Sequence, residues 1–180
     1  LSRDTGISMG ALYSYIASKE RLLEIILRQV LHLVEVTLGA EEVARLEPRE
    51  RLRWLLRNHI FLSEVMQPWF FFTYMEAKSF DRAGKRMAIE NELRTERLIA
   101  ACLAAGQQAG VFRQLDPVMA ASLIKPLLQD WYLKRWKYRR RDVSPDSYAD
   151  WVIGFVEAFL LAQQGRAQAA KVQATAIAGG

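Results

Sequence analysis

The chain has 180 residues, of which 51% are hydrophobic, 25% charged and 11% aromatic, and its formal net charge is +5. The apolar fraction is too high for a disordered chain, and a single cysteine, Cys102, excludes a disulfide framework and a cysteine-rich zinc site. No apolar run approaches the roughly 18 residues that a membrane-spanning helix needs, so we expect a cytoplasmic protein with one core, or one core and a small appendage.

The residue types along the chain indicate an all-α protein. Glycine and proline are sparse, alternating β-branched runs are absent, and leucine, alanine, glutamate, arginine and glutamine dominate. A first helix ends at Gly6, and a short helix over residues 9–15 follows the N-cap residue Ser8. Ser18 is the N-cap of a long helix that runs to about Leu38.

The middle of the chain predicts two more helices. Pro48 occupies a favoured first-turn position, and apolar residues recur at helical steps until Pro68 ends the helix. A very aromatic stretch follows over residues 69–75. The next helix runs from about 84 to 109, and Gly110 ends it.

Two long helices complete the predicted fold. One covers about residues 116–140, where the interior Pro126 predicts a kink. The other opens at Ser144 and ends near Gln164. Residues 165–180 form a tail rich in alanine, glutamine and glycine, which is either helical or frayed.

The last of these helices is apolar over more than half of its circumference. One stripe contains Tyr148, Trp151, Val152, Phe155 and Phe159, and a neighbouring stripe contains Ala149, Ile153, Val156 and Leu160. A helix of this kind must be covered on two sides. We expect the core on one side and a second copy on the other, in a homodimer through the last two long helices; burial within a larger monomeric bundle is the alternative.

Residues 1–23 have the order of a helix-turn-helix motif, which places its second helix in the major groove of DNA. Gly6 permits the sharp turn, and Ile7 and Leu12 fill the angle between the helices. Small residues let the start of the second helix approach a phosphate, and tyrosine and lysine side chains contact further phosphates. The predicted DNA-binding residues are Ser8, Met9, Gly10, Ala11, Tyr13, Ser14, Tyr15 and Lys19. A plain helical hairpin within a bundle is the alternative.

This segment resembles the tetracycline-repressor (TetR) family of bacterial transcriptional regulators. The resemblance is carried by Gly6-Ile7-Ser8, Gly10, Leu12-Tyr13, Tyr15-Ile16, Ser18-Lys19-Glu20 and Leu22-Leu23. Met9, Ala11 and Ile16 depart from the residues common in the family, although Ala11 could still touch a thymine methyl group. In the family another helix and most of a second precede this segment, so we expect the front of the DNA-binding domain to be absent here.

The resemblance implies a TetR-like repressor with two regions. Residues 1–38 would be a partial helix-turn-helix domain, with its first helix absent, and a connecting helix. Residues 39–164 would be an effector-binding and dimerisation domain, before the tail at 165–180. The implied partners are double-stranded operator DNA, a small-molecule effector and a second copy, with no membrane and no cofactor. A filled effector cavity would respace two DNA heads whose half-sites lie about 34–36 Å apart.

Aromatic and apolar residues of the larger region supply candidate walls for the effector cavity. They are Trp54, Phe61, Met66, Trp69, Phe70, Phe72, Tyr74, Met75, Leu98, Cys102, Leu127 and Trp131. Such walls suit an aromatic, lipid-like or acyl ligand, and the alternative is that most of these residues belong to the core. The candidate polar contacts are His59, Glu76, Lys78, Lys125 and Asp130. A satisfied core histidine and ordinary ion pairs are the alternative for these.

The positive charge is concentrated between Lys134 and Arg141, and without this segment the chain is close to neutral. Three interpretations stay open. The segment is a solvated helix end, where cations suit the helix dipole; it binds a phosphate-bearing effector such as an acyl-CoA, which resembles what some members of the family do; or it is an auxiliary DNA contact. Trp136 and Tyr138 within the segment favour a packed or binding role.

The sequence lacks the motifs that an enzyme would use. Glycine-rich phosphate loops are absent, and neither His32 nor His59 has a glutamate three residues before it, as di-iron bundles do. Two histidines and one cysteine leave little for a metal site or a nucleophile pair. We therefore expect a regulator and not an enzyme. A helical interaction protein that does not bind DNA, or a small helical enzyme, is the alternative.

Overall fold

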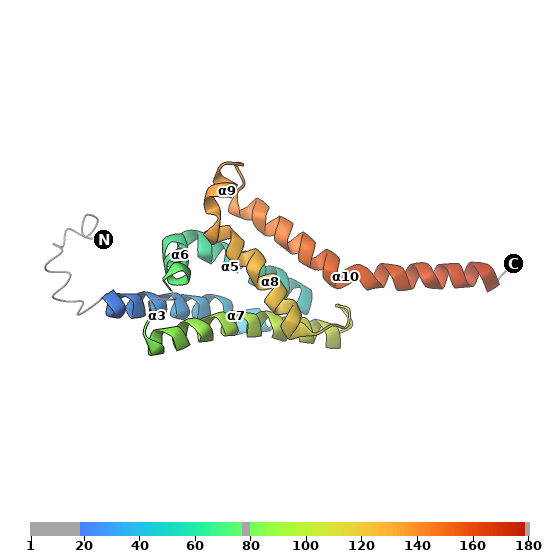
Figure 1. Ribbon diagram of the computed structural model, residues 1–180. Helices are drawn as coiled ribbons and strands as arrows, with labels where there is room; N and C mark the ends of the chain where they lie inside the picture. Colours follow the sequence, from blue (N-terminus) through green and yellow to red (C-terminus); the bar gives the residue numbers. More distant parts are fainter. Residues whose placement is uncertain (1–18, 77–79, 179–180) are drawn as a thin grey trace.

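The computed structural model describes residues 19–76 and 80–178, with side chains described at residues 21, 24–76 and 80–161. Its helices are α3 (Lys19–Leu38), α4 (Glu41–Ala44), α5 (Pro48–Val65), α6 (Gln67–Met75), α7 (Arg82–Gln108), α8 (Pro117–Leu133), α9 (Arg135–Arg139) and α10 (Pro145–Ala178) (Figure 1). The described residues contain no strand, which confirms the all-α class.

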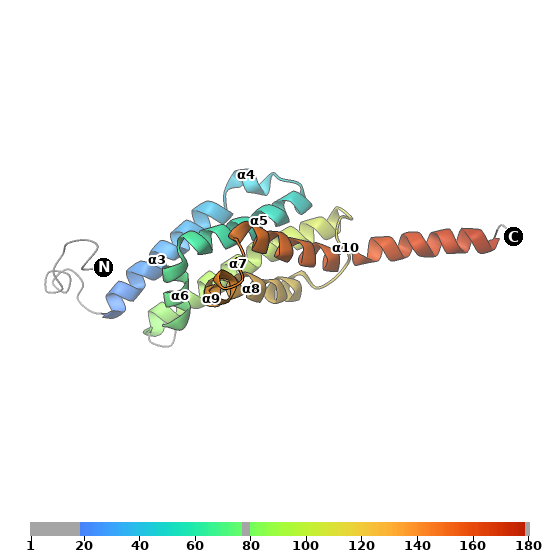
Figure 2. The ribbon, with the colours of Figure 1, turned by 90° about the horizontal axis from the view of Figure 1, so that it is seen from above.

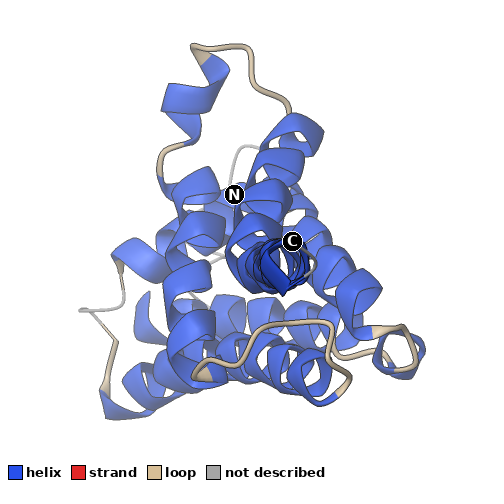
Figure 3. Cartoon of the chain, turned by 90° about the vertical axis from the view of Figure 1, so that its right-hand side faces the viewer, coloured by secondary structure: helices blue, strands red, loops and turns tan. Residues whose placement is uncertain are grey.

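Helix α5 lies at the centre of the bundle, where it contacts α3, α7, α8 and α10 (Figure 2). It buries Leu52, Leu56 and Ile60 at the three- and four-residue spacing of an amphipathic helix. Leu128 of α8 and Leu160 of α10 continue the same apolar core. The end-on view in Figure 3 shows this packing of helix against helix, which positions the cavity described below.

Two helix boundaries follow the signals in the sequence closely. Gly110 takes a left-handed backbone conformation, with φ of 69°, and the N–H groups of Val111 and Phe112 then donate to the carbonyl of Gly106 at 2.8 and 3.1 Å. The Asp116 carboxylate accepts backbone N–H groups of the first turn of α8. Both boundaries are set by residues at the helix end itself, in agreement with the predicted stop at Gly110 and the predicted start near residue 116.

The predicted end of a helix at Pro68 is wrong. Helix α5 ends at Val65, and Met66 interrupts the helix with backbone angles of −105° and 25°. Pro68 lies in the first turn of α6, a position where the missing N–H group costs nothing. The aromatic stretch is therefore a helix of its own.

The helix predicted over 116–140 is divided at a different place from the expected kink. The helix α8 passes through Pro126 and ends before Lys134, whose φ of −119° and ψ of 29° leave the helical region. Beyond this break, α9 brings Tyr138 onto Trp131 and Tyr148, with ring centroids 5.3 and 4.7 Å apart. Aromatic packing between distant segments therefore accompanies the break.

The last helix continues to Ala178, beyond its predicted end near Gln164, and its second half projects from the bundle (Figures 1 and 2). The stripe that contains Ala149 and Val156 is buried in the core. On the opposite side, Trp151 and Phe155 are 77% and 67% exposed. One side of this helix is thus covered within the chain, and the other is open.

The predicted first helix and the short helix over residues 9–15 lie outside the described residues. Among the helices that are described, none is long and apolar enough to cross a membrane.

Candidate functional site

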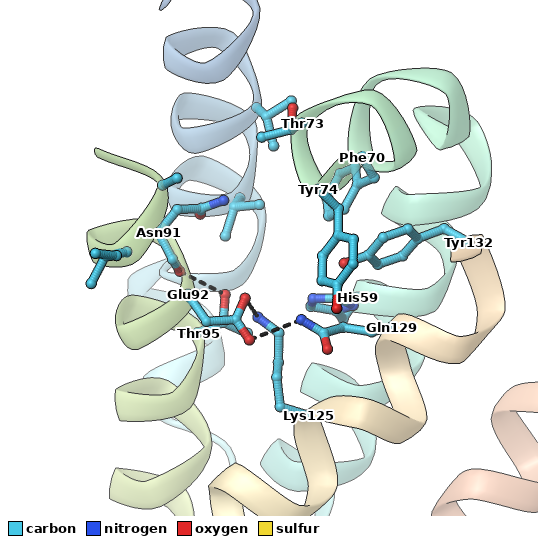
Figure 4. Close-up of a pocket in the computed structure, with 14 residues that line it drawn as sticks. His59, Phe70, Thr73, Tyr74, Asn91, Glu92, Thr95, Lys125, Gln129 and Tyr132 are labelled. Atoms are coloured by element: carbon cyan, nitrogen blue, oxygen red, sulfur yellow. Dashed lines mark hydrogen bonds and ion pairs between the residues drawn. The ribbon is translucent and has the colours of Figure 1, made fainter. Parts of the chain in front are cut away.

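A cavity of about 370 Å³ lies between α3, α5, α6, α7 and α8 (Figure 4). Its apolar lining consists of Val30, Val34, Phe70, Ala88 and Ile89. Its polar lining consists of His59, Thr73, Tyr74, Asn91, Glu92, Thr95, Lys125, Gln129 and Tyr132. A concave site of this size that combines apolar walls with convergent polar groups is typical of small-molecule binding.

An ion pair crosses this cavity from α8 to α7. Lys125 is only 5% exposed, and its ammonium group lies 3.2 Å from the carboxylate of Glu92. The amide of Gln129 donates to the same carboxylate at 2.9 Å. Burial lowers the pKa of Lys125, and the charge of Glu92 opposes that shift. The pair ties the two helices together and carries no net charge.

His59 is the second buried polar residue of the cavity, at 2% exposed. Its ring lies edge-on to Phe70, with centroids 6.0 Å apart. Burial, helped by the charge of Lys125, lowers the pKa of His59 to about 3, so the imidazole is neutral at physiological pH. Its Nδ1 atom has no hydrogen-bond partner among the described residues, and the same is true of the Asn91 side-chain oxygen.

The structure brings only part of the predicted lining together. Phe70 and Tyr74 line the cavity, and Met66 and Trp69 line a neighbouring groove of about 530 Å³ against Ile25 of α3. The predicted residues that line neither the cavity nor this groove are Trp54, Phe61, Phe72, Met75, Leu98, Cys102, Leu127 and Trp131.

Cys102 and Trp131 show where such residues go instead. Both are buried in the main core. The Cys102 thiol donates to the carbonyl of Pro48 at 3.1 Å, and the Trp131 indole N–H donates to Glu64 at 3.0 Å. Helical spacing marks a buried face, but it does not separate a residue that fills the core from one that lines a cavity.

The polar candidates divide in the same way. His59 and Lys125 line the cavity, whereas Asp130 lies elsewhere and pairs with Lys134 and Lys137, each at 2.8 Å. Glu76 is the C-cap residue of α6, and Lys78 lies outside the described residues.

Three polar lining residues of α7 were missed by the sequence reasoning. They are Asn91, Glu92 and Thr95. Their common signal is a polar group on the inward side of an amphipathic helix, because Thr95 is buried and Asn91 is half-buried. Lys125 within an apolar run gave the clearest signal of the same kind.

The predicted DNA-binding residues all fall within the first 19 positions of the chain. Ser8, Met9, Gly10, Ala11, Tyr13, Ser14 and Tyr15 lie outside the described residues. Lys19 begins α3, but its side chain is not among those described.

A second, open groove of about 640 Å³ lies between α6 and the basic segment of α9. Arg135, Trp136 and Arg139 line one side of it, and Phe71 lines the other. Arg135 pairs with Glu64, whereas Trp136 is exposed. Burial lowers the pKa of Arg135 and the nearby charge of Arg139 lowers it further. Tyr132 lines both this groove and the cavity between α3, α5, α6, α7 and α8.

Comparisons with known proteins agree on one family. Residues 45–160 match the family model described as "Tetracyclin repressor-like, C-terminal domain". The HTH-type transcriptional regulator HbdR of Aromatoleum sp. (strain CIB) is 26% identical over 179 residues, which cover 99% of this chain and 77% of that protein.

Solved structures share the fold. A regulatory protein of the TetR family from Rhodococcus RHA1 superposes with a TM-score of 0.77 at 20% identity, over 88% of this chain and 83% of that one. AibR in complex with isovaleryl coenzyme A and operator DNA superposes with a TM-score of 0.68 at 22% identity, over 86% and 83%. The chain therefore belongs to the tetracycline repressor family of transcriptional regulators, and it is a regulator and not an enzyme.

Proposed function

We propose that the protein is a cytoplasmic repressor that binds operator DNA and is released by a small apolar or acyl-type effector. The single observation that carries this proposal is the position of the cavity against α3. Val30 and Val34 of α3 form part of the cavity wall, and the same helix begins at Lys19, directly after the predicted reading helix. A ligand that displaces α3 would therefore move the part of the chain that reads DNA.

The effect of such a movement follows from the geometry of operators. Two reading helices must meet half-sites about 34–36 Å apart, so a modest rotation of each head weakens both contacts at once. The effector must bind better to the state that does not fit DNA. The apolar contacts that α3 makes with the ligand supply that difference in affinity.

A homodimer fits this proposal, because one chain offers an uncovered apolar face. Trp151, Phe155 and Phe159 of α10 are exposed on the side away from the core. On α8, Val118, Met119 and Leu123 are exposed as well. A two-fold interface through these two helices would cover both sets of side chains.

The cavity and the groove beside α9 together support an acyl-type effector that carries a phosphate group. The cavity has the size for an acyl group, and the groove beside α9 offers arginine and an exposed indole, which suit phosphate and a stacked base. AibR, which shares the fold, was solved with isovaleryl coenzyme A. We infer that an acyl-CoA occupies both the cavity and the groove beside α9, with Tyr132 between them.

The test is operator binding by the full-length protein, measured by gel shift on the promoter region of its own operon. Parent protein should bind specifically, and one or more acyl-CoAs from a series of chain lengths should release it. Ala88→Phe fills the cavity, so it should keep operator binding and lose release. Ala101→Phe, on the exposed side of the same helix, is the matched control and should behave as the parent.

Two results would count against the proposal. Absence of specific DNA binding by the full-length protein would favour the helical interaction protein. Release of Ala88→Phe at the same effector concentration as the parent would move the effector out of this cavity.

A further inference from the structure

Two residues that line the cavity carry polar atoms without a partner in the described part of the chain. His59 is almost completely buried, yet its Nδ1 atom has no hydrogen-bond partner among the described residues, and the Asn91 side-chain oxygen has none either. Figure 4 shows these two side chains on opposite walls, from α5 and α7. An unpaired buried polar atom destabilises the site, and a plain hydrocarbon ligand would leave that atom unpaired.

The charges around the cavity limit what can pair with His59. Lys125 is already held by Glu92, so the described lining residues offer no unpaired cation for a carboxylate. A ligand carboxylate would also have to share the cavity with the Glu92 carboxylate, and a ligand ammonium group would face Lys125. Like charges at short range are unfavourable in a partly enclosed site. A neutral polar group avoids both costs.

A hydroxyl is the neutral group that suits a neutral imidazole best. One ring nitrogen of such an imidazole donates and the other accepts, and a hydroxyl does both. It can therefore pair with Nδ1 in either tautomer. A methyl group of similar size could not pair with Nδ1 at all. The nearly perpendicular contact between the Phe70 and His59 rings restricts the orientation of the imidazole.

We propose that this cavity recognises a ligand that carries a neutral hydroxyl group, which forms a hydrogen bond with His59 Nδ1. The inference rests on the proposed function, since it concerns the effector site. It adds a specificity: the hydroxylated ligand is preferred to the same skeleton with a methyl group in that place. The expected preference is about tenfold in dissociation constant, the equivalent of one well-formed hydrogen bond.

The test uses matched small probes and needs neither DNA nor coenzyme A. The probes are phenol against toluene and cyclohexanol against methylcyclohexane, added to the full-length protein labelled with ¹⁵N in its histidines. The histidine signal that disappears in His59→Leu is that of His59. The hydroxylated probe of each pair should bind more tightly and shift the Nδ1 resonance, and its methyl analogue should not shift it.

Variants separate recognition from a structural role. In His59→Leu the hydroxyl and methyl probes should bind equally. His59→Gln keeps a hydrogen-bonding group and should retain part of the preference for the hydroxyl probe. Ser63→Ala, one turn further along α5, is the matched control, because Ser63 is also buried but bonds to the carbonyl of Ile60. If His59→Leu does not fold, the imidazole signal of the unmodified side chain decides the question.

The inference is overturned if methyl and hydroxyl probes bind the parent protein equally, if neither binds, or if the Nδ1 signal does not respond. A preference unchanged in His59→Leu would overturn it too. Failure of operator release leaves these measurements intact, and a failed preference leaves operator release intact, so the two proposals are tested separately.

Discussion

At the scale of single residues, Glu157 shows how a charged group is held inside a helical bundle. It lies on α10 and is nearly buried, and its carboxylate accepts hydrogen bonds from Arg49 at 2.9 Å and from Arg53 at 2.6 Å. The two arginines are one turn apart on the same face of α5, so both side chains can bind the same carboxylate. We call this arrangement the Glu157 clamp. The hydrogen bonds from Arg49 and Arg53 lower the pKa of Glu157 to about 2.

This clamp predicts a specific dependence of stability on pH. The pKa of Glu157 is lower in the folded protein than in the unfolded chain, so the stabilisation is complete above about pH 4.5 and is lost as pH falls towards 2. The contribution is about 2 kcal/mol. The free energy of urea unfolding should therefore decrease between pH 5 and pH 3 more steeply in the parent than in Glu157→Gln.

Glu41→Gln is the control for this experiment. Glu41 pairs with Arg45 on the surface at 3.7 Å, and such a pair contributes little. Its unfolding curve should follow that of the parent at each pH. Parallel curves for the parent and Glu157→Gln would show that the clamp contributes nothing that depends on pH.

At the scale of helices, the sequence predicted the elements whose ends are set locally. The structure confirms the predicted boundaries near Leu38, at Pro48, before Gly110 and near residue 116. The break at Lys134 was not predictable in this way, because it accompanies packing of Tyr138 on distant aromatic residues. The spacing of apolar residues at three and four positions describes the buried face of a single helix and does not report which distant residues that face packs against.

The candidate site was less predictable than the helices for a related reason. The cavity takes residues from five helices, and only the packing of those helices decides which inward side chains meet a hollow. Phe70 and Tyr74 line the cavity, whereas Cys102 and Trp131 share the same periodicity and fill the core. Of the polar residues that the sequence marked as candidate contacts, His59 and Lys125 line the cavity.

The exposed face of α8 and α10 makes a prediction about assembly. Phe155→Glu places a charge in the centre of the proposed interface, where it would be buried without a partner. Sedimentation velocity should show the parent as a dimer and this variant as a monomer, with unchanged helical content. Val36→Glu alters an exposed apolar residue on α3 and should remain dimeric. A monomeric parent at micromolar concentration would exclude the proposed interface.

At the scale of the whole molecule, a further prediction concerns the cavity and the groove beside α9, which share Tyr132. Arg139→Glu removes the cation beside the open groove and should raise the acyl-CoA concentration needed for operator release by about tenfold. Arg86→Glu, an exposed arginine at the start of α7, makes the same change of charge elsewhere and should have little effect. Titration of DNA release by fluorescence anisotropy would measure both. An equal effect of the two variants would mean that only net charge matters.

Helix α3 contributes to the wall of the cavity and also leads directly from the segment predicted to read DNA. If one helix serves both tasks, the influence is mutual, and operator DNA must weaken the binding of effector by the same factor by which effector weakens the binding of DNA. The sensitivity of the protein to its effector is then no fixed constant. A cell that carries additional copies of the operator, for instance on a plasmid, would need a higher concentration of the effector to reach the same response.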